Sequence, residues 1–194
     1  FAELVGLLPA GCEVVLEAKG GQAAIRSEAN EYSLVTLPAD DYPNWRVESA
    51  SSRLELKQGQ FKHLVDAVAY AIPAKDHRRV LQGALMEVKS MTLRLTGTDG
   101  KKLSRIQTEL AEIEGDESVS LVVPGKLVAD VRRTLGDEGP LRIETGSRQA
   151  AFFLDNIEFR TNCIEGRYPD CDAVIPKEFA NRAKLNRDTF QIAA

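Results

Sequence analysis

Residues 128–169 read VADVRRTLGDEGPLRIETGSRQAAFFLDNIEFRTNCIEGRYP, and residues 1–43 can be laid over them with a single one-residue gap. The matched positions are mostly apolar, and both segments share a Gln-Ala-Ala string and a Tyr-Pro pair. They are Phe1, Leu4 and Leu8 with Val128, Val131 and Leu135, Val15 and Leu16 with Arg142 and Ile143, residues 22–24 with 149–151, Tyr32 with Phe159, Leu37 with Ile164, and Tyr42-Pro43 with Tyr168-Pro169. A spacing of about 127 residues is too long for a solenoid unit and suits a whole domain. The pattern therefore predicts copies of one domain in series.

The repeat also predicts where the copies begin and end. We expect residues 1–45 to be the second half of one copy, residues 52–170 a complete copy, and residues 174–194 the start of a third. Nothing precedes Phe1 to match residues 50–127, so we expect the sequence to begin inside a copy and to be an incomplete piece.

The hydrophobic spacing predicts a strand, a helix and three strands, in that order and twice over, within the complete copy. The helices are expected at residues 58–72, with Phe61, Leu64 and Val68 on the apolar face, and from about Pro124 to about Leu135. The strands are expected at residues 53–57, 81–88, 91–98, 103–110, 118–123, 141–145, 149–154 and 157–162. The first segment is expected to hold a helix at 1–8 and strands at 12–19, 22–27 and 31–37, with Gly20-Gly21 as a hairpin turn. Helices that interrupt antiparallel strands indicate the α+β class.

The composition is ordinary for a soluble globular protein, with 43% hydrophobic and 28% charged residues. No apolar run approaches the roughly 20 residues that span a membrane. Cys12, Cys163 and Cys171 lack CxxC spacing and fit a reducing compartment, so we expect a cytoplasmic protein without a metal or other cofactor. The net charge of −4 argues against a basic nucleic-acid coat, although basic residues can still gather on one surface.

Four short strings lie in an order and at a spacing that covers nearly the whole chain. They are residues 37–44 (LPADDYPN), 98–100 (TDG), 122–124 (VVP) and 165–170 (EGRYPD), the last leading to Ile175-Pro176-Lys177. With these strings the chain resembles the bacterial DNA polymerase III beta subunit, the sliding clamp. The resemblance implies a DNA clamp fold of repeated βαβββ units, with antiparallel sheets outside and helices on one face. It also implies a non-catalytic processivity factor, a head-to-tail dimeric ring around duplex DNA that tethers the replicative polymerase, the clamp loader and repair polymerases through linear peptide motifs.

The resemblance assigns DNA contacts to four basic residues. Lys75 and Arg79 lie in the run that follows the first helix, and Lys126 and Arg133 lie off the apolar stripe of the second helix. Such side chains would neutralise phosphates without reading base sequence. The alternative is a solvated helix face and a solvated loop of mixed charge.

The resemblance places a partner-peptide groove at Arg78, Leu81, Thr98, Gly100, Lys101, Lys102, Leu103, Pro169 and Val174. The apolar members would form a floor for a hydrophobic anchor, and the basic members a polar rim. The chain departs from the family pattern at Lys101, where the best-known members carry His, and at Ala173, where they often carry Arg. The alternatives are core packing for Leu81 and Leu103 and a plain hairpin turn for Thr98 to Gly100.

The third implied surface is the joint of the ring, at an edge strand matching residues 31–37, with Tyr32 and Leu34 as apolar anchors. Glu31 and Ala29 stand where some members carry basic residues, which leaves the ion pairs across the joint open. An in-domain packing strand is the alternative for Tyr32.

Two other functions compete with the clamp. A hydrolase could use His77 with Asp76 or Asp99, but the sequence has no HExxH, GxSxG or phosphate-binding glycine loop. A folded clamp piece that closes no ring is the other alternative.

Overall fold

The computed structural model describes residues 2–27, 30–42 and 50–193, which fall into two compact units, Phe1–Arg46 and Val47–Ala194. Phe1, Ala29, Pro43 and the predicted segment end at residue 45 lie outside the described residues.

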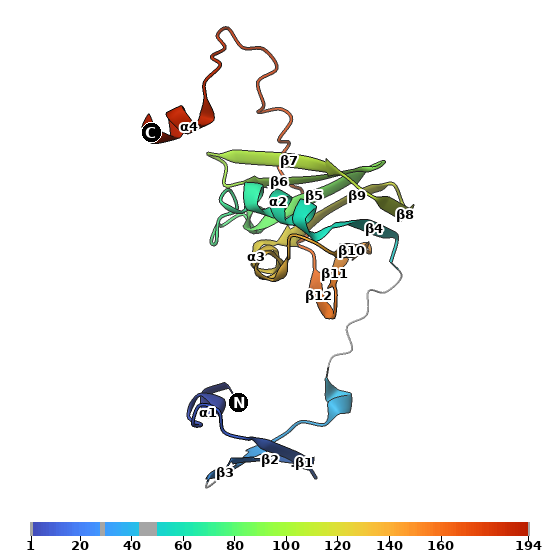
Figure 1. Cartoon of the computed structure of the whole chain (residues 1–194). Coiled ribbons are helices and arrows are strands. Elements are labelled where there is room, and N and C mark those ends of the chain that lie inside the picture. The colour runs from blue at the N-terminus through green and yellow to red at the C-terminus, as the bar shows by residue number, and fades with distance from the viewer. Residues whose placement is uncertain (1, 28–29, 43–49, 194) are drawn as a thin grey trace. The chain divides into compact units, whose positions relative to one another are not determined.

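The first unit contains a short helix and a three-stranded antiparallel sheet (Figure 1). Its elements are α1 (Ala2–Gly6), β1 (Val15–Lys19), β2 (Gln22–Ser27), β3 (Asn30–Val35) and the 3-10 turn η1 (Ala39–Asp41), and the strand order is β1-β2-β3. Lys19 pairs with Gln22, so Gly20 and Gly21 alone make the turn, with φ of 58° and 80°. Two consecutive residues with positive φ suit the right-handed twist of a hairpin, which confirms the predicted turn.

The second unit holds two helices and nine strands among its described residues before the tail. They are β4 (Ser52–Lys57), α2 (Gln58–Ala69), the 3-10 turn η2 (Arg79–Gln82), β5 (Gly83–Lys89), β6 (Thr92–Thr98), β7 (Leu103–Glu109), β8 (Glu112–Gly115), β9 (Ser118–Pro124), α3 (Gly125–Thr134), β10 (Pro140–Thr145), β11 (Gln149–Leu154) and β12 (Ile157–Asn162). A further helix, α4 (Arg187–Ala193), follows in the tail. Every strand predicted for this unit is present within a few residues of its expected bounds.

The two strand–helix–three-strand repeats exchange their first strands. One sheet has the order β12-β11-β10-β4-β8 and the other β7-β6-β5-β9, so β4 joins the three later strands and β9 joins the three earlier ones. Leu54 of β4 pairs with Ile143 of β10, and both side chains are fully buried. This exchange makes the two repeats one folding unit, because neither sheet is complete without the other repeat.

Strand β8 is an addition that the sequence analysis missed. It is four residues long, reads EIEG, and pairs with β4. Arg53 of β4 donates to Glu114 of β8 at 2.9 Å and to Glu144 of β10 at 3.3 Å, so one guanidinium bridges three neighbouring strands. A short strand with two glutamates gives no clear hydrophobic alternation, which is why the pattern alone did not reveal it.

Helix α2 buries the predicted stripe. Phe61, Leu64, Val65 and Val68 are at most 3% exposed, and the Phe61 ring lies 5.7 Å from that of Phe152 on β11. The helix ends at Ala69 instead of Ile72, because the last amides form tighter bonds, from Ala71 N to Val68 O and from Ile72 N to Ala69 O.

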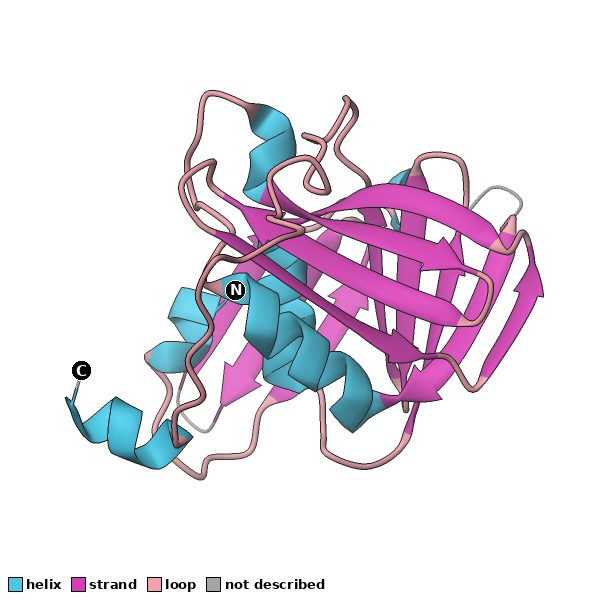
Figure 2. Ribbon diagram, turned by 90° about the horizontal axis from the view of Figure 1, so that it is seen from above, coloured by secondary structure: helices cyan, strands magenta, loops and turns pink. Residues whose placement is uncertain are grey.

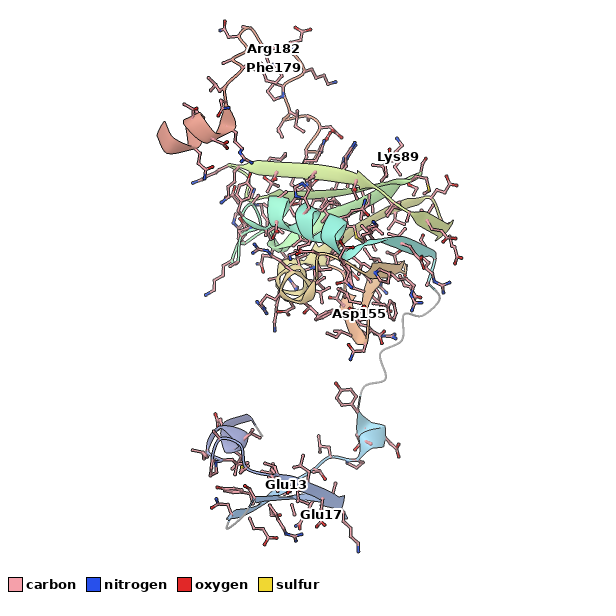
Figure 3. All side chains as sticks on the ribbon, in the orientation of Figure 1. Glu13, Glu17, Lys89, Asp155, Phe179 and Arg182 are labelled. Carbon is pink, nitrogen blue, oxygen red and sulfur yellow. The ribbon has the colours of Figure 1, made fainter. Side chains whose placement is uncertain are left out.

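The start of α2 is held by a buried amide. Gln58 is 2% exposed, and its side chain accepts a hydrogen bond from Gly136 N and donates to Pro140 O and to Asp155. Asp155 lies in the two-residue turn between β11 and β12 (Figure 3). One polar side chain thereby joins the helix, the loop after α3 and a hairpin turn.

The predicted internal repeat has a counterpart in strand register. Ala18 pairs with Ala23, and Ala23 with Leu34, in the first unit. The sequence alignment maps these onto Thr145 with Ala150, and Ala150 with Thr161, which are the pairs observed in the second unit. The half copy therefore has the same strand pairing as the second repeat of the complete copy.

Helices α2 and α3 pack side by side in the second unit and lie on one side of its sheets (Figures 1 and 2). Their apolar faces, with Val128 and Val131 from α3, enter the core that both sheets share. None of the described helices is long and apolar enough to cross a bilayer.

Candidate nucleic-acid interface and partner groove

The outward face of α2 and α3, called here the helix face, consists of His63, Asp66, Tyr70, Lys126, Ala129, Arg132 and Arg133, which are all exposed. These positions repeat every three or four residues on each helix, opposite the buried stripe. Arg132 of α3 forms an ion pair with Asp66 of α2, and Arg133 forms one with Asp130 on its own helix. Both arginines therefore have carboxylate partners already.

The structure brings two of the predicted DNA contacts together. Arg79, at the start of η2, and Lys126, in the first turn of α3, line one open cavity of about 840 Å³. Arg132, Gln82 and Glu165 line it too, and the sequence analysis had named none of these three for the site. Ile72, Pro73 and Val128 supply an apolar wall. The cavity thus places several cations and one carboxylate beside the N-terminus of α3.

The other two predicted contacts lie differently. Lys75 is exposed in the loop before η2 and does not line this cavity, and Arg133 lies on the helix face, bound to Asp130. Lys75, Arg79 and Lys126 form no ion pair with a carboxylate in the described part of the chain. Of the four predicted DNA contacts, these three can therefore meet an anion without first losing a carboxylate partner.

The turn between β6 and β7 is tightly organised. Asp99 Oδ1 accepts the amides of Lys101 and Lys102, each at 2.9 Å, and Thr98 Oγ1 accepts the amide of Gly100 at 3.0 Å and donates to Lys102 O at 2.7 Å. The two amides hold the pKa of Asp99 below its usual range. Gly100 has φ of +87°, which an L side chain adopts only with strain.

Arg78 joins this turn to the loop before η2. Its guanidinium donates to Asp99 O at 3.0 Å and to both carboxylate oxygens of Asp76 at 3.1 Å. These bonds, and the Arg78 amide at 2.8 Å, lower the pKa of Asp76 to about 2. A Cβ on Gly100 would lie 3.0 Å from the guanidinium nitrogens, so the glycine also leaves room for Arg78.

The predicted apolar floor is partly a packed core. Leu81 is fully buried in a small cluster with Val122, Tyr168 and Cys171, and the half-buried Leu103 packs against it. Pro169 is exposed beside this cluster, and Val174 is 67% exposed in the tail. The structure thus brings Arg78, Thr98 and residues 100–102 together at the turn, and Leu81 with Leu103 in the cluster that contains Tyr168, while Val174 belongs to neither group.

Strand β3 is an edge of the first unit's sheet, as the sequence predicted for the ring joint. Tyr32 and Leu34 are half-buried on one face, and Val35 and Leu37 are 87% and 85% exposed. Glu31 forms an ion pair with Arg26 of β2 at 3.0 Å. The strand therefore offers free backbone groups at an edge, with an apolar residue on each face.

The geometry does not favour the hydrolase alternative. His77 lies 3.4 Å from Asp76 but is 86% exposed, and the carboxylate is taken up by Arg78. The carboxylate beside a catalytic histidine has to orient the imidazole and stabilise its protonated form, which Asp76 is not free to do. The part of the chain that the structure describes holds no cluster of three or more potential metal ligands.

Comparison with known protein families identifies the family to which this fold and these residues correspond. A family model for the DNA polymerase III beta subunit, central domain, matches residues 55–170. The chain belongs to the DNA polymerase III beta subunit family. The matched range runs from β4 to the start of the tail, so it contains both helices, both sheets and the loop with Arg78 and Arg79.

Individual relatives agree with the family model. The chain is 32% identical over 178 residues to the beta sliding clamp of Escherichia coli (strain K12), covering 91% of this chain and 48% of that protein. The Helicobacter pylori beta clamp bound to a DNA ligase peptide is 25% identical, with a TM-score of 0.82 over 92% of this chain and 50% of that one. The Bacillus subtilis sliding clamp is 27% identical, with a TM-score of 0.78 over 91% and 47%. The chain thus has the DNA clamp fold and spans about half the length of the relatives it matches.

Proposed function

We propose that this chain is part of a sliding clamp, a ring that encloses duplex DNA and holds a replicative polymerase on it. The observation that carries the proposal is that Arg79 and Lys126 line one cavity. This cavity lies beside two helices that pack on one side of the sheets, and the chain belongs to the DNA polymerase III beta subunit family. In this reading residues 1–45, 52–170 and 174–194 belong to the first, second and third clamp domains.

The DNA-facing surface in this proposal is the helix face together with the loop that carries Lys75 and Arg79. Cations without carboxylate partners bind phosphates most readily, because no internal ion pair has to be broken first. Lys75, Arg79 and Lys126 are therefore the principal phosphate contacts, and Arg133 is a weaker one. Enclosure by a ring supplies retention, so these contacts need only be weak and independent of base sequence.

The partner surface is the turn between β6 and β7 with its neighbours, the groove residues predicted from the sequence. Lys101 and Lys102 stand at its rim, and its apolar members that are not fully buried are the half-buried Leu103 and the exposed Pro169 and Val174. A DNA ligase peptide is bound to the related Helicobacter pylori clamp, which supports linear peptides as the partner class. Tyr32 and Leu34 on the edge strand β3 are the proposed anchors of a head-to-tail dimer.

We also propose that the protein is non-catalytic, works in the cytoplasm and needs no cofactor. Its role in replication is then to bind and recruit, and any polymerase or nuclease activity belongs to its partners. The alternative of a clamp piece that folds without closing a ring remains open for this chain by itself.

Duplex binding tests the proposal. Two fluorescent 20-base-pair duplexes of unrelated sequence are titrated with the chain at several salt concentrations. We expect equal affinities for both, falling linearly in log–log form with a slope of about −0.9 for each phosphate contact. Binding that depends on the sequence would refute the proposed phosphate contacts, and absent binding at low salt would favour the alternative of a clamp piece that closes no ring.

A further inference from the structure

The loop before η2 and the turn between β6 and β7 are separate in sequence, yet one side chain connects them. Arg78 Nη2 donates to Asp76 Oδ2 at 3.1 Å and to Asp99 O at 3.0 Å. The guanidinium therefore lies between a carboxylate on its own loop and a carbonyl on the turn.

Asp76 holds Arg78 in this place. Its carboxylate accepts three hydrogen bonds from Arg78, from the amide at 2.8 Å and from Nε and Nη2 at 3.1 Å each. The Asp76 side chain is only 13% exposed, and its backbone carbonyl accepts Gln82 Nε2 at 2.7 Å. Charge-assisted bonds of this kind fix a planar guanidinium in one orientation. The loop is thus fastened at two points, to η2 by Gln82 and to the turn by Arg78.

We infer that Asp76 is a positioning residue, which acts through Arg78 to hold the loop that presents Lys75 and Arg79 to duplex DNA. Lys75 precedes Asp76 directly and Arg79 follows Arg78 directly, so the hydrogen-bonded pair of Asp76 and Arg78 lies between the two cations in the sequence. The inference rests on the proposed DNA-binding function and adds a residue that carries the same sign of charge as the phosphates.

The negative charge of Asp76 allows an effect of charge to be separated from an effect of position. If Asp76 acted on DNA through its charge alone, its replacement by Asn would remove a repulsion and tighten binding. If Asp76 positions the loop, the same replacement frees Arg78 and the two cations, and binding weakens. An effect of charge and an effect of position therefore predict opposite changes in the duplex affinity of Asp76→Asn.

The experiment compares Asp76→Asn with Glu114→Gln in the whole chain. Glu114 is a matched control because it also forms an ion pair with an arginine, and Glu114→Gln removes the same negative charge. It lies on β8, in a different sheet from β6 and β7. We expect Asp76→Asn to bind a 20-base-pair duplex about fivefold more weakly than Glu114→Gln at low salt, a typical size for coupled sites. Binding by Asp76→Asn that equals or exceeds that of Glu114→Gln overturns the inference.

A second pair of variants separates geometry from charge. Arg78→Lys keeps the net charge but loses the planar fork, so it should weaken duplex binding as Asp76→Asn does. The double variant Asp76→Asn, Arg78→Lys should bind duplex no more weakly than either single variant, because both changes break the same Asp76–Arg78 interaction. Additive losses overturn the inference.

Amide hydrogen exchange gives a reading that does not depend on DNA. Asp76→Asn should speed exchange at residues 76–79 and at 99–102, while Glu114→Gln leaves both segments unchanged. Unchanged exchange in Asp76→Asn overturns the inference. If the unaltered chain fails to bind duplex, the proposed duplex contact fails for this chain, and the exchange result still decides whether Asp76 positions the loop.

Discussion

Asp66 of α2 and Arg132 of α3 form an ion pair that joins the two helices across the helix face. The pair leaves Arg132 partly neutralised at the rim of the cavity that Arg79 and Lys126 also line. The helix face is therefore less positive than its arginines and lysines alone imply, and the carboxylates on it limit how tightly it can hold an anion.

Asp66→Asn should tighten duplex binding with little effect on stability. The replacement removes a negative charge from the helix face and frees Arg132, so the salt slope should steepen by about 0.9 if Arg132 gains one phosphate contact. Both partners are about half exposed, at 52% for Arg132 and 43% for Asp66, so the free energy of unfolding should change by less than about 1 kcal/mol. Fluorescence titration and urea unfolding measure the two quantities, and weaker duplex binding would contradict the arrangement.

Leu54→Ala should strongly destabilise the second unit. Leu54 is fully buried on β4, the exchanged strand, between Ile143 of β10 and Ile113 of β8. Truncation of a buried leucine costs about 2–5 kcal/mol in the free energy of unfolding. Leu185→Ala, at a tail position that is 65% exposed, is the matched control and should change it by less than about 0.5 kcal/mol. Similar losses in the two variants on urea unfolding would mean that β4 does not lie in the core.

Tyr168 should make stability fall at high pH. Burial raises the pKa of Tyr168 to about 12, above the value of about 10 for an unfolded chain, so the fold favours the neutral phenol. Its contribution is complete below about pH 10 and is lost as the pH rises from about 10 to about 12.

Tyr168→Phe, which cannot ionise, isolates this effect. The free energy of unfolding of the unaltered chain, relative to that of the variant, should be lower at pH 11 than at pH 9. The absorbance of phenolate near 295 nm should show one tyrosine fewer titrating above pH 11 in the variant. A stability difference that is the same at both pH values would rule out a buried phenol.

Local patterns in the sequence predicted the elements well. The stripe of Phe61, Leu64 and Val68 and the Gly20-Gly21 turn are local signals, because helix spacing and turn chemistry depend only on neighbouring residues. The exchange of β4 and β9 between sheets was not predicted, since strand partners are chosen by long-range packing that periodicity does not encode. Strand β8 was missed for a different reason, since its four residues, EIEG, are too few to show a clear hydrophobic alternation.

The candidate site was predictable only in part. The family resemblance pointed to Arg79 and Lys126, but the cavity that they share forms where η2 and the start of α3 meet. The link that Asp76 and Arg78 make to the turn depends on the backbone carbonyl of Asp99, and a backbone acceptor leaves no residue-type signal in a sequence. Burial of Leu81 likewise follows from its packing in a cluster with Val122, Tyr168 and Cys171, which are distant in sequence.

The salt dependence of duplex binding by an Arg79→Glu, Lys126→Glu double variant tests the central claim most directly. The account predicts that reversing both charges lowers affinity at low salt and flattens the log–log slope by about 1.8, the loss of two phosphate contacts. The matched control is Lys89→Glu at the exposed end of β5 (Figure 3), which should keep the slope of the unaltered chain. A double variant with the affinity and slope of that control would contradict the account.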